Sequence, residues 1–127
     1  MFTTIEFWAW AASALLALLY LLAGAMKSAR PIDVLAKMMG WPADVPAWLV
    51  RFVGVAELAG AVGLILPVWT GILPWLTPLA AIGLSLVQIL AIPFHIRRCE
   101  GKAVPMNLVL LALSLFVLWA RRALIGL

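Results

Sequence analysis

The residue in this chain best suited to chemistry is a carboxylate inside an apolar stretch. Glu57 lies near the middle of VGVAELAGAVGLILP, which runs from Val53 to Pro67. A charged side chain at the centre of a membrane helix costs about 2.5 to 3.5 kcal/mol, so by default it faces the protein interior, has a partner and marks function. The alternative is a protonated Glu57 that hydrogen-bonds a neighbouring helix, typically for about 0.6 kcal/mol. The larger cost favours a functional role, and the protonation state of Glu57 stays open.

Polar residues also recur on single faces of the other apolar stretches. Residues seven apart share a helix face because seven residues drift by only about 20°. At a rise of about 1.5 Å per residue, Tyr20, Glu57 and Gln88 fall at similar depths. The pattern therefore predicts a polar seam that faces the interior of a helical bundle. Its stripes are Ser13, Tyr20 and Lys27; Gly54, Glu57 and Ala61; Ser85, Gln88 and His95; and Asn107, Ser114 and Arg121.

A second polar layer is expected closer to one membrane surface. Lys27, Arg51 and His95 should gather there, at the mouth of the bundle. His95 is interpreted first as a polar anchor at the interface, and second as a proton relay or a contact for a quinone headgroup. The candidate functional polar site consists of Glu57, Lys27, His95, Gln88, Tyr20 and Arg51.

No self-contained catalytic or metal site is predicted. His95 is the only histidine and Cys99 the only cysteine, and no cluster has the spacing for zinc, haem or an iron–sulfur centre. A single cysteine also excludes a self-contained dithiol oxidoreductase. We therefore assign no catalytic residue, and leave open whether the protein is an enzyme. No cofactor is encoded, and quinone is the one candidate.

The composition indicates which elements position these residues. The 127 residues are 67% hydrophobic and only 11% charged, which predicts an integral membrane protein. Four apolar stretches approach the roughly 20 residues that span a bilayer, at about 7–26, 47–66, 73–94 and 105–120. The first is expected to be retained as a span, because no Lys or Arg precedes it. The prediction is an all-α membrane protein, a four-transmembrane-helix bundle forming one domain over residues 1–127.

A short interfacial helix is expected between the first two spans. Ile32, Leu35, Ala36 and Met39 follow helical spacing, with Pro31 before them and Gly40 after them, which predicts an amphipathic helix at the membrane surface. Asp44 is expected to cap the second span, with Pro46 in its first turn.

The basic residues indicate orientation. Most of the nine lie in or beside two segments, 27–46 and 95–104, while Arg121 and Arg122 lie on the opposite side. By the positive-inside rule, both segments are cytoplasmic and both termini face outward from the cell (inner) membrane. The basic residues form no long soluble face, so nucleic acid is not expected as a partner.

Small residues surround Glu57 on its own helix. Gly54, Ala56, Gly60 and Gly63 are expected to serve close helix packing, either inside the bundle or against another subunit. The partners expected are therefore the lipid bilayer and either redox-complex subunits or further copies of this chain.

Three segments together resemble the DoxX-like family of small four-span membrane proteins: LLAGAMKSARPIDVLAKMMGW, LVRFVGVAELAGAVGLILP and LVQILAIPFHIRRCEGK. The resemblance depends on Gly24 and Lys27, on the Gly-x-x-Glu-Leu of Gly54 to Leu58, and on His95. The family takes its name from a subunit associated with thiosulfate:quinone oxidation, and distant eukaryotic relatives look like assembly chaperones. The resemblance implies that Lys27, Glu57 and His95 are the residues to test.

Two functions follow as hypotheses. The first is a non-catalytic subunit or anchor of a quinone-linked redox system, with the buried polar site around Glu57 contacting a quinone headgroup or relaying protons. The alternative is a membrane assembly or scaffold protein whose polar seam is purely structural. A small-solute transporter has less support, since four spans without inverted repeats make a poor alternating-access device.

Overall fold

The computed structural model describes residues 3–127, and all regular structure within that range is helical. Four of the helices are long and apolar enough to cross a membrane, which confirms the predicted all-α membrane bundle. Short 3₁₀ turns lie at Trp41–Ala43, Gly101–Ala103 and Arg122–Ile125. The α-helices are α1 (Thr4–Ala29), α2 (Ile32–Met39), α3 (Ala47–Thr70), α4 (Leu76–Arg97) and α5 (Val104–Ala120).

The ends of the spans are set by backbone chemistry rather than by hydropathy, so several predicted boundaries are displaced. α1 begins at Thr4 because the Thr3 hydroxyl accepts a hydrogen bond from the Glu6 amide at 3.0 Å, three residues before the predicted start. α3 continues through Pro67 and ends only at Thr70, where Gly71 follows as the cap with a left-handed φ of 74°. The turn between α3 and α4 is therefore shorter than predicted.

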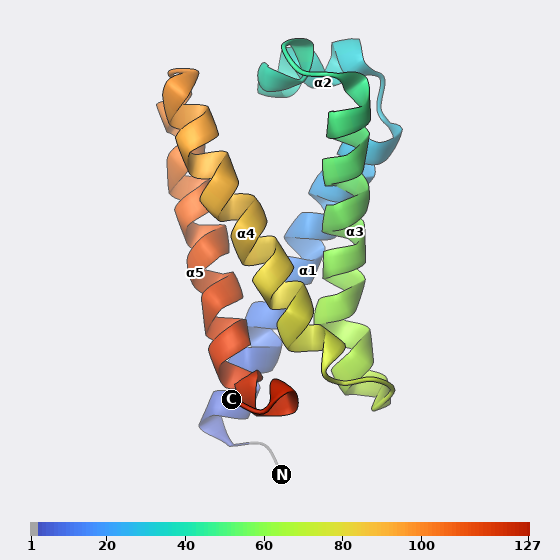
Figure 1. Ribbon diagram of the computed structural model, residues 1–127, viewed down its shortest axis with the longest axis vertical. Coiled ribbons are helices and arrows are strands. Elements are labelled where there is room, and N and C mark those ends of the chain that lie inside the picture. Colours follow the sequence, from blue (N-terminus) through green and yellow to red (C-terminus); the bar gives the residue numbers. More distant parts are fainter. Residues whose placement is uncertain (1–2) are drawn as a thin grey trace.

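The four spans form an antiparallel bundle in which α1 packs against α3, α3 against α4, α4 against α5, and α5 against α1. Both termini lie at one end of the molecule, and α2 crosses the other end (Figure 1). The predicted interfacial helix is thus present, and its Leu35 side chain is fully buried. We refer to these two ends as the terminal end and the α2 end.

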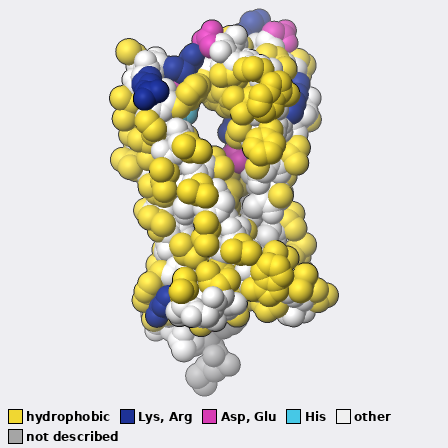
Figure 2. Space-filling view, viewed as in Figure 1, with side chains coloured by type: hydrophobic (Ala, Val, Ile, Leu, Met, Phe, Trp, Pro, Cys, Tyr) yellow, Lys and Arg dark blue, Asp and Glu magenta, His cyan; other side chains and the backbone are white. Residues whose placement is uncertain are grey.

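The α1–α3 pair and the α4–α5 pair are close together at the terminal end and spread apart from each other at the α2 end (Figure 1). Contacts between α3 and α4 hold the terminal half together: the Thr77 hydroxyl donates to the Gly63 carbonyl at 2.8 Å, and Gly60 packs directly on Leu84. The space-filling view shows the resulting hollow at the α2 end, with an acidic side chain at its lower edge (Figure 2).

The prediction that Asp44 caps α3 is wrong. The cap position is Pro46, and no side chain bonds the first free amides of the helix. Asp44 lies two residues before that position and instead receives a hydrogen bond from Arg98 at 2.6 Å.

Candidate functional site

Two glycines set the distance between α1 and α3. A Cβ on Gly24 would lie 2.7 Å from the Gly54 carbonyl oxygen, and a Cβ on Gly54 would lie 2.7 Å from the Ser28 amide nitrogen. Only residues without a side chain allow two helix backbones to approach this closely. Each glycine precedes a charged residue by three positions, so the same crossing brings Lys27 and Glu57 together.

Glu57 and Lys27 form an ion pair inside the bundle. The Lys27 Nζ donates to Glu57 Oε1 at 2.6 Å, and Glu57 is only 2% exposed. Lys27 also lies over the Trp41 ring, 5.8 Å from its centroid. The sequence analysis expected a partner for Glu57 without naming it, and in the structure that partner is Lys27.

Arg51 lies in the same region but does not pair with Glu57. Its Nη1 donates to the carbonyls of Lys27 at 2.9 Å and of Arg30 at 2.6 Å. These are the carbonyls left free at the end of α1, where a cation also opposes the negative end of the helix dipole. Arg51 therefore fixes the helix end that carries Lys27.

Tyr20 and Gln88 link the two sides of the bundle. The Gln88 Nε2 donates to the Tyr20 hydroxyl at 2.8 Å, although α1 and α4 are not neighbours in the helix arrangement. Both side chains are buried. The other amide atom of Gln88, Oε1, is enclosed without a hydrogen-bond partner in the described part of the chain, and so is the Nδ2 of Asn107. Buried polar atoms without a protein partner are places for water or a ligand.

Most of the predicted polar stripes are indeed buried. Ser85 and Ser114, however, each donate to a carbonyl of their own helix, Ala81 and Leu110 respectively, both at 2.7 Å. Both of these serine hydroxyls thus donate within their own helix. The buried members of the predicted stripes are Ser13, Tyr20, Gly54, Glu57, Ala61, Ser85, Gln88, Asn107, Ser114 and Arg121.

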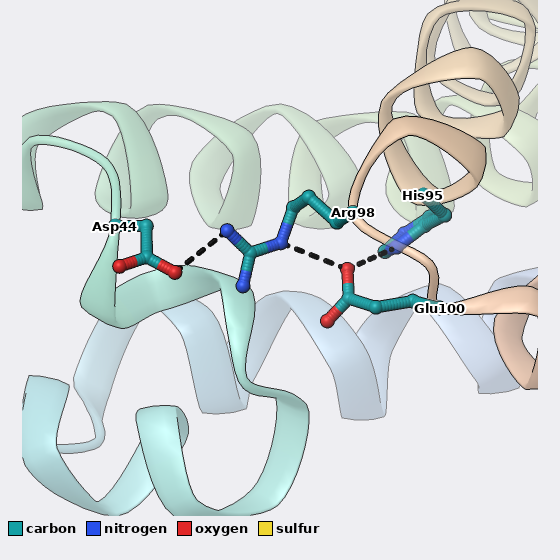
Figure 3. Close-up of polar contacts among 4 residues, drawn as sticks. All are labelled: Asp44, His95, Arg98 and Glu100. Carbon is teal, nitrogen blue, oxygen red and sulfur yellow. Dashed lines mark hydrogen bonds and ion pairs between the residues drawn. The ribbon is translucent and has the colours of Figure 1, made fainter.

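His95 has a partner that the sequence analysis did not consider. Its Nδ1 lies 3.1 Å from Glu100 Oε1, the same oxygen that accepts from Arg98 Nε at 3.0 Å, and Arg98 bonds Asp44 (Figure 3). This chain of four residues joins the end of α4 to the linker before α3. Trp41 packs edge-on against Phe94 beside it, with ring centroids 6.1 Å apart.

We call Asp44, Arg98, Glu100 and His95 the α2-end bridge. Partial burial opposes the ionisation of Glu100, but the hydrogen bonds from His95 and Arg98 outweigh it and lower the pKa of that carboxyl. The hydrogen bond with Asp44 is the main cause that raises the pKa of Arg98. The bridge thus spans the open end of the molecule with charged groups.

The bridge and one further ion pair were not predicted from the sequence. Arg121 Nη1 donates to both carboxylate oxygens of Glu6, at 2.7 and 2.9 Å, which ties the start of α1 to the end of α5. One signal was available for each: the paired residues lie on the same predicted side of the membrane and carry opposite charges. That signal reduces the number of possible partners for each charged residue but does not identify which of them it contacts.

Small residues around Glu57 divide between two neighbours. Gly54 faces α1, whereas a Cβ on Gly60 or Gly63 would meet Leu84 or Ala80 of α4 within 2.8 Å. Ala56 is half-buried and lines an apolar groove between α3 and α4.

Chemically, the site combines a proton donor, Lys27, and an acceptor, Glu57. Glu57 lies one helical turn from Gly60, where α3 and α4 meet, on the side toward the α2 end. Within the described residues, the second carboxylate oxygen of Glu57 accepts no hydrogen bond, and Lys27 uses one of its three donors on a side chain. Both groups retain capacity for another polar partner.

Four apolar spans around an ion pair between a buried glutamate and a partly buried lysine define a multi-pass integral membrane protein. The chain belongs to the DoxX-like family, whose pattern it matches over residues 11–117. That range contains Gly24, Lys27, Gly54, Glu57 and His95, on which the resemblance was based. No curated protein and no solved structure matches the chain at a significant level.

Proposed function

We propose that this protein is a non-catalytic subunit or anchor of a quinone-linked redox system, in which the Lys27–Glu57 pair binds a quinone headgroup or passes a proton to it. The observation that carries the proposal is the position of the ion pair one helical turn from Gly60, on the side toward the α2 end, where the space-filling view shows a hollow with an acidic side chain at its edge (Figure 2). A pair that served packing alone has no need of a neighbouring open space.

The residues present fit such a headgroup. Lys27 has ammonium donors to spare for a carbonyl oxygen, and the free oxygen of Glu57 can accept or deliver a proton. Gln88 offers a further unsatisfied oxygen nearby in the seam. Quinone would supply the redox chemistry, while this chain would bind, orient and exchange protons.

Substitution of Glu57 by Gln tests the proposal, because the amide keeps the shape of the side chain and removes the ionisable group. We expect Glu57→Gln and Lys27→Met to weaken binding of a decyl-benzoquinone to the purified protein in nanodiscs by tenfold or more, about 1.4 kcal/mol. Asp33→Asn is the matched control, because Asp33 is an exposed carboxylate on α2 and is not part of the ion pair. Unchanged quinone binding in variants that unfold at the wild-type temperature would overturn the proposal.

A scaffold function is the second candidate. It is supported by the fact that both buried polar pairs, Lys27–Glu57 and Tyr20–Gln88, join different helices. A purely structural seam would keep any partner protein bound after Glu57→Gln. Co-purification from mild detergent therefore separates the two functions, since a redox site would lose quinone binding while a scaffold would retain its partner.

We further propose that the α2 end faces the cytoplasm across the cell (inner) membrane. Five basic residues there have no acidic partner in the described part of the chain: Arg30, Lys37, Arg51, Arg97 and Lys102. Only Arg122 is comparable at the terminal end, which supports cytoplasmic placement of the α2 end by the positive-inside rule.

A further inference from the structure

We infer that the groove between α3 and α4 binds an apolar chain attached to the headgroup that the Lys27–Glu57 pair receives. The inference rests on the proposed function and adds a second part to the ligand. It assigns the ligand class as an amphiphile whose polar head occupies the hollow and whose hydrocarbon chain lies along two helices.

The groove has the size and lining of a site for a hydrocarbon chain. Its volume is about 760 Å³, within the range of roughly 300 to 1,000 Å³ that small-molecule sites occupy. The lining residues carry no charge, and Thr70 at the far end holds the only side-chain polar group among them. The groove is deep because small residues line both of its walls: Ala56, Ala59 and Gly63 on α3, and Ala80 and Gly83 on α4.

The groove begins at the depth of the polar site on both helices, and this position is the reason for the proposed occupant. Ala56 and Val87 line its inner end and are the chain neighbours of Glu57 and Gln88. From there it runs to the turn that follows Thr70. A molecule with its head at the ion pair would therefore direct an attached chain into the groove.

The groove is also open to the surrounding lipid. Val62, Leu66 and Leu79 line it and are 41 to 48% exposed. A membrane-dissolved ligand could thus enter from the side, with its chain remaining in an apolar environment throughout. No water-filled route would be required.

Gly83 provides a test that leaves the helix packing intact. A Cβ built on Gly83 meets no atom within 4 Å, so a larger side chain there extends into the groove. Gly60 and Gly63 are unsuitable, because a Cβ on either would collide with Leu84 or Ala80. Gly83→Leu should fill the groove, and Gly83→Ala is the matched control that leaves most of it free.

The experiment compares a benzoquinone without a chain and the same benzoquinone with a decyl chain, each titrated into wild type, Gly83→Leu and Gly83→Ala in nanodiscs. Affinities are corrected for partitioning into protein-free nanodiscs. We expect Gly83→Leu to weaken decyl-benzoquinone binding by at least about tenfold, because buried apolar area is lost, and to leave the chain-free quinone unaffected. Gly83→Ala should behave as wild type.

Other outcomes contradict the inference in distinguishable ways. Equal binding of decyl-benzoquinone to wild type and Gly83→Leu would overturn the groove assignment and leave the proposed function standing. A dimer that Gly83→Leu dissociates would identify a second copy as the occupant and also overturn it. Failure of both quinones to bind the wild type would overturn the proposed function, and the groove assignment with it.

Discussion

Glu57 illustrates how one residue is accommodated in a bilayer. Its carboxylate would cost about 2.5 to 3.5 kcal/mol at the centre of an isolated helix. Here a lysine from the neighbouring helix lies 2.6 Å away, and two glycines bring the backbones close enough for that contact. The sequence predicted the depth of Glu57 and the need for a partner, because both follow from spacing along one helix.

Which charged residues pair at the loops could not be predicted in the same way. His95 and Glu100 meet because the chain reverses immediately after α4, and Arg98 reaches Asp44 across 54 positions in the sequence. Charged loop residues have no periodicity that restricts their neighbours. Their pairing depends on how far apart the helix ends lie, which only the assembled bundle determines.

Acidification tests the contribution of Glu100 to the α2-end bridge. Its pKa is lowered from an ordinary 4.5 in the folded protein, so Glu100 contributes stability above pH 4.5 that is lost as the pH falls through the lowered pKa. We expect the wild type to unfold at a higher temperature than Glu100→Gln at neutral pH. The difference should shrink below pH 4.5.

Thermal unfolding in detergent, followed by circular dichroism at several pH values, measures this difference. His95 and Arg98, which contact Glu100, and Asp44, which contacts Arg98, are present in both proteins, so their own titration is largely common to the two. A difference that is absent at neutral pH, or that grows on acidification, would contradict the prediction.

At the scale of elements, the four spans were predictable because each is a long apolar run, and α2 was predictable from its amphipathic spacing. The direction in which the helices lean was not. The spread at the α2 end depends on contacts at the other end, such as Gly60 against Leu84, and those contacts pair residues from two different runs.

The α1–α3 crossing makes a prediction about helix packing. Gly54→Ala should destabilise the protein by about 1 to 3 kcal/mol, because the added Cβ would collide with the backbone at Ser28 and force α1 away. Unfolding in detergent by a denaturant titration measures the change.

Gly83→Ala is the matched control for that substitution. It adds the same methyl group to a membrane helix where nothing lies within 4 Å, and alanine favours helix over glycine by up to about 1 kcal/mol in water. We expect Gly83→Ala to be neutral or slightly stabilising. Equal destabilisation by the two substitutions would show that loss of glycine, and not the collision, is responsible.

The whole molecule places its two ends in different surroundings, which gives a prediction about orientation. Cys99 is exposed in the connection between α4 and α5, near the α2 end, whereas Leu127 is exposed at the terminal end. If the α2 end is cytoplasmic, a membrane-impermeant maleimide should label Cys99 only in inside-out vesicles. A Cys99→Ser/Leu127→Cys variant should be labelled only in right-side-out vesicles.

The two cysteine positions serve as controls for each other, because a membrane-impermeant maleimide outside a sealed vesicle can reach only one side of the membrane. Labelling in the reversed pattern would place the α2 end outside the cell. Labelling of both positions in one sealed preparation would contradict a chain whose ends are separated by the membrane.

The ion pair between Glu6 and Arg121 has a consequence for how the protein is made. Its partners are 115 positions apart, near the first and the last turns of the spanning helices. Such a contact brings together residues that are widely separated in the sequence, and chains dominated by contacts of that kind fold more slowly. During synthesis α1 emerges long before Arg121 leaves the ribosome, so Glu6 must spend that interval without this partner. Closure of the terminal end is therefore a late event in assembly, and it can occur only after all four spans are in the membrane.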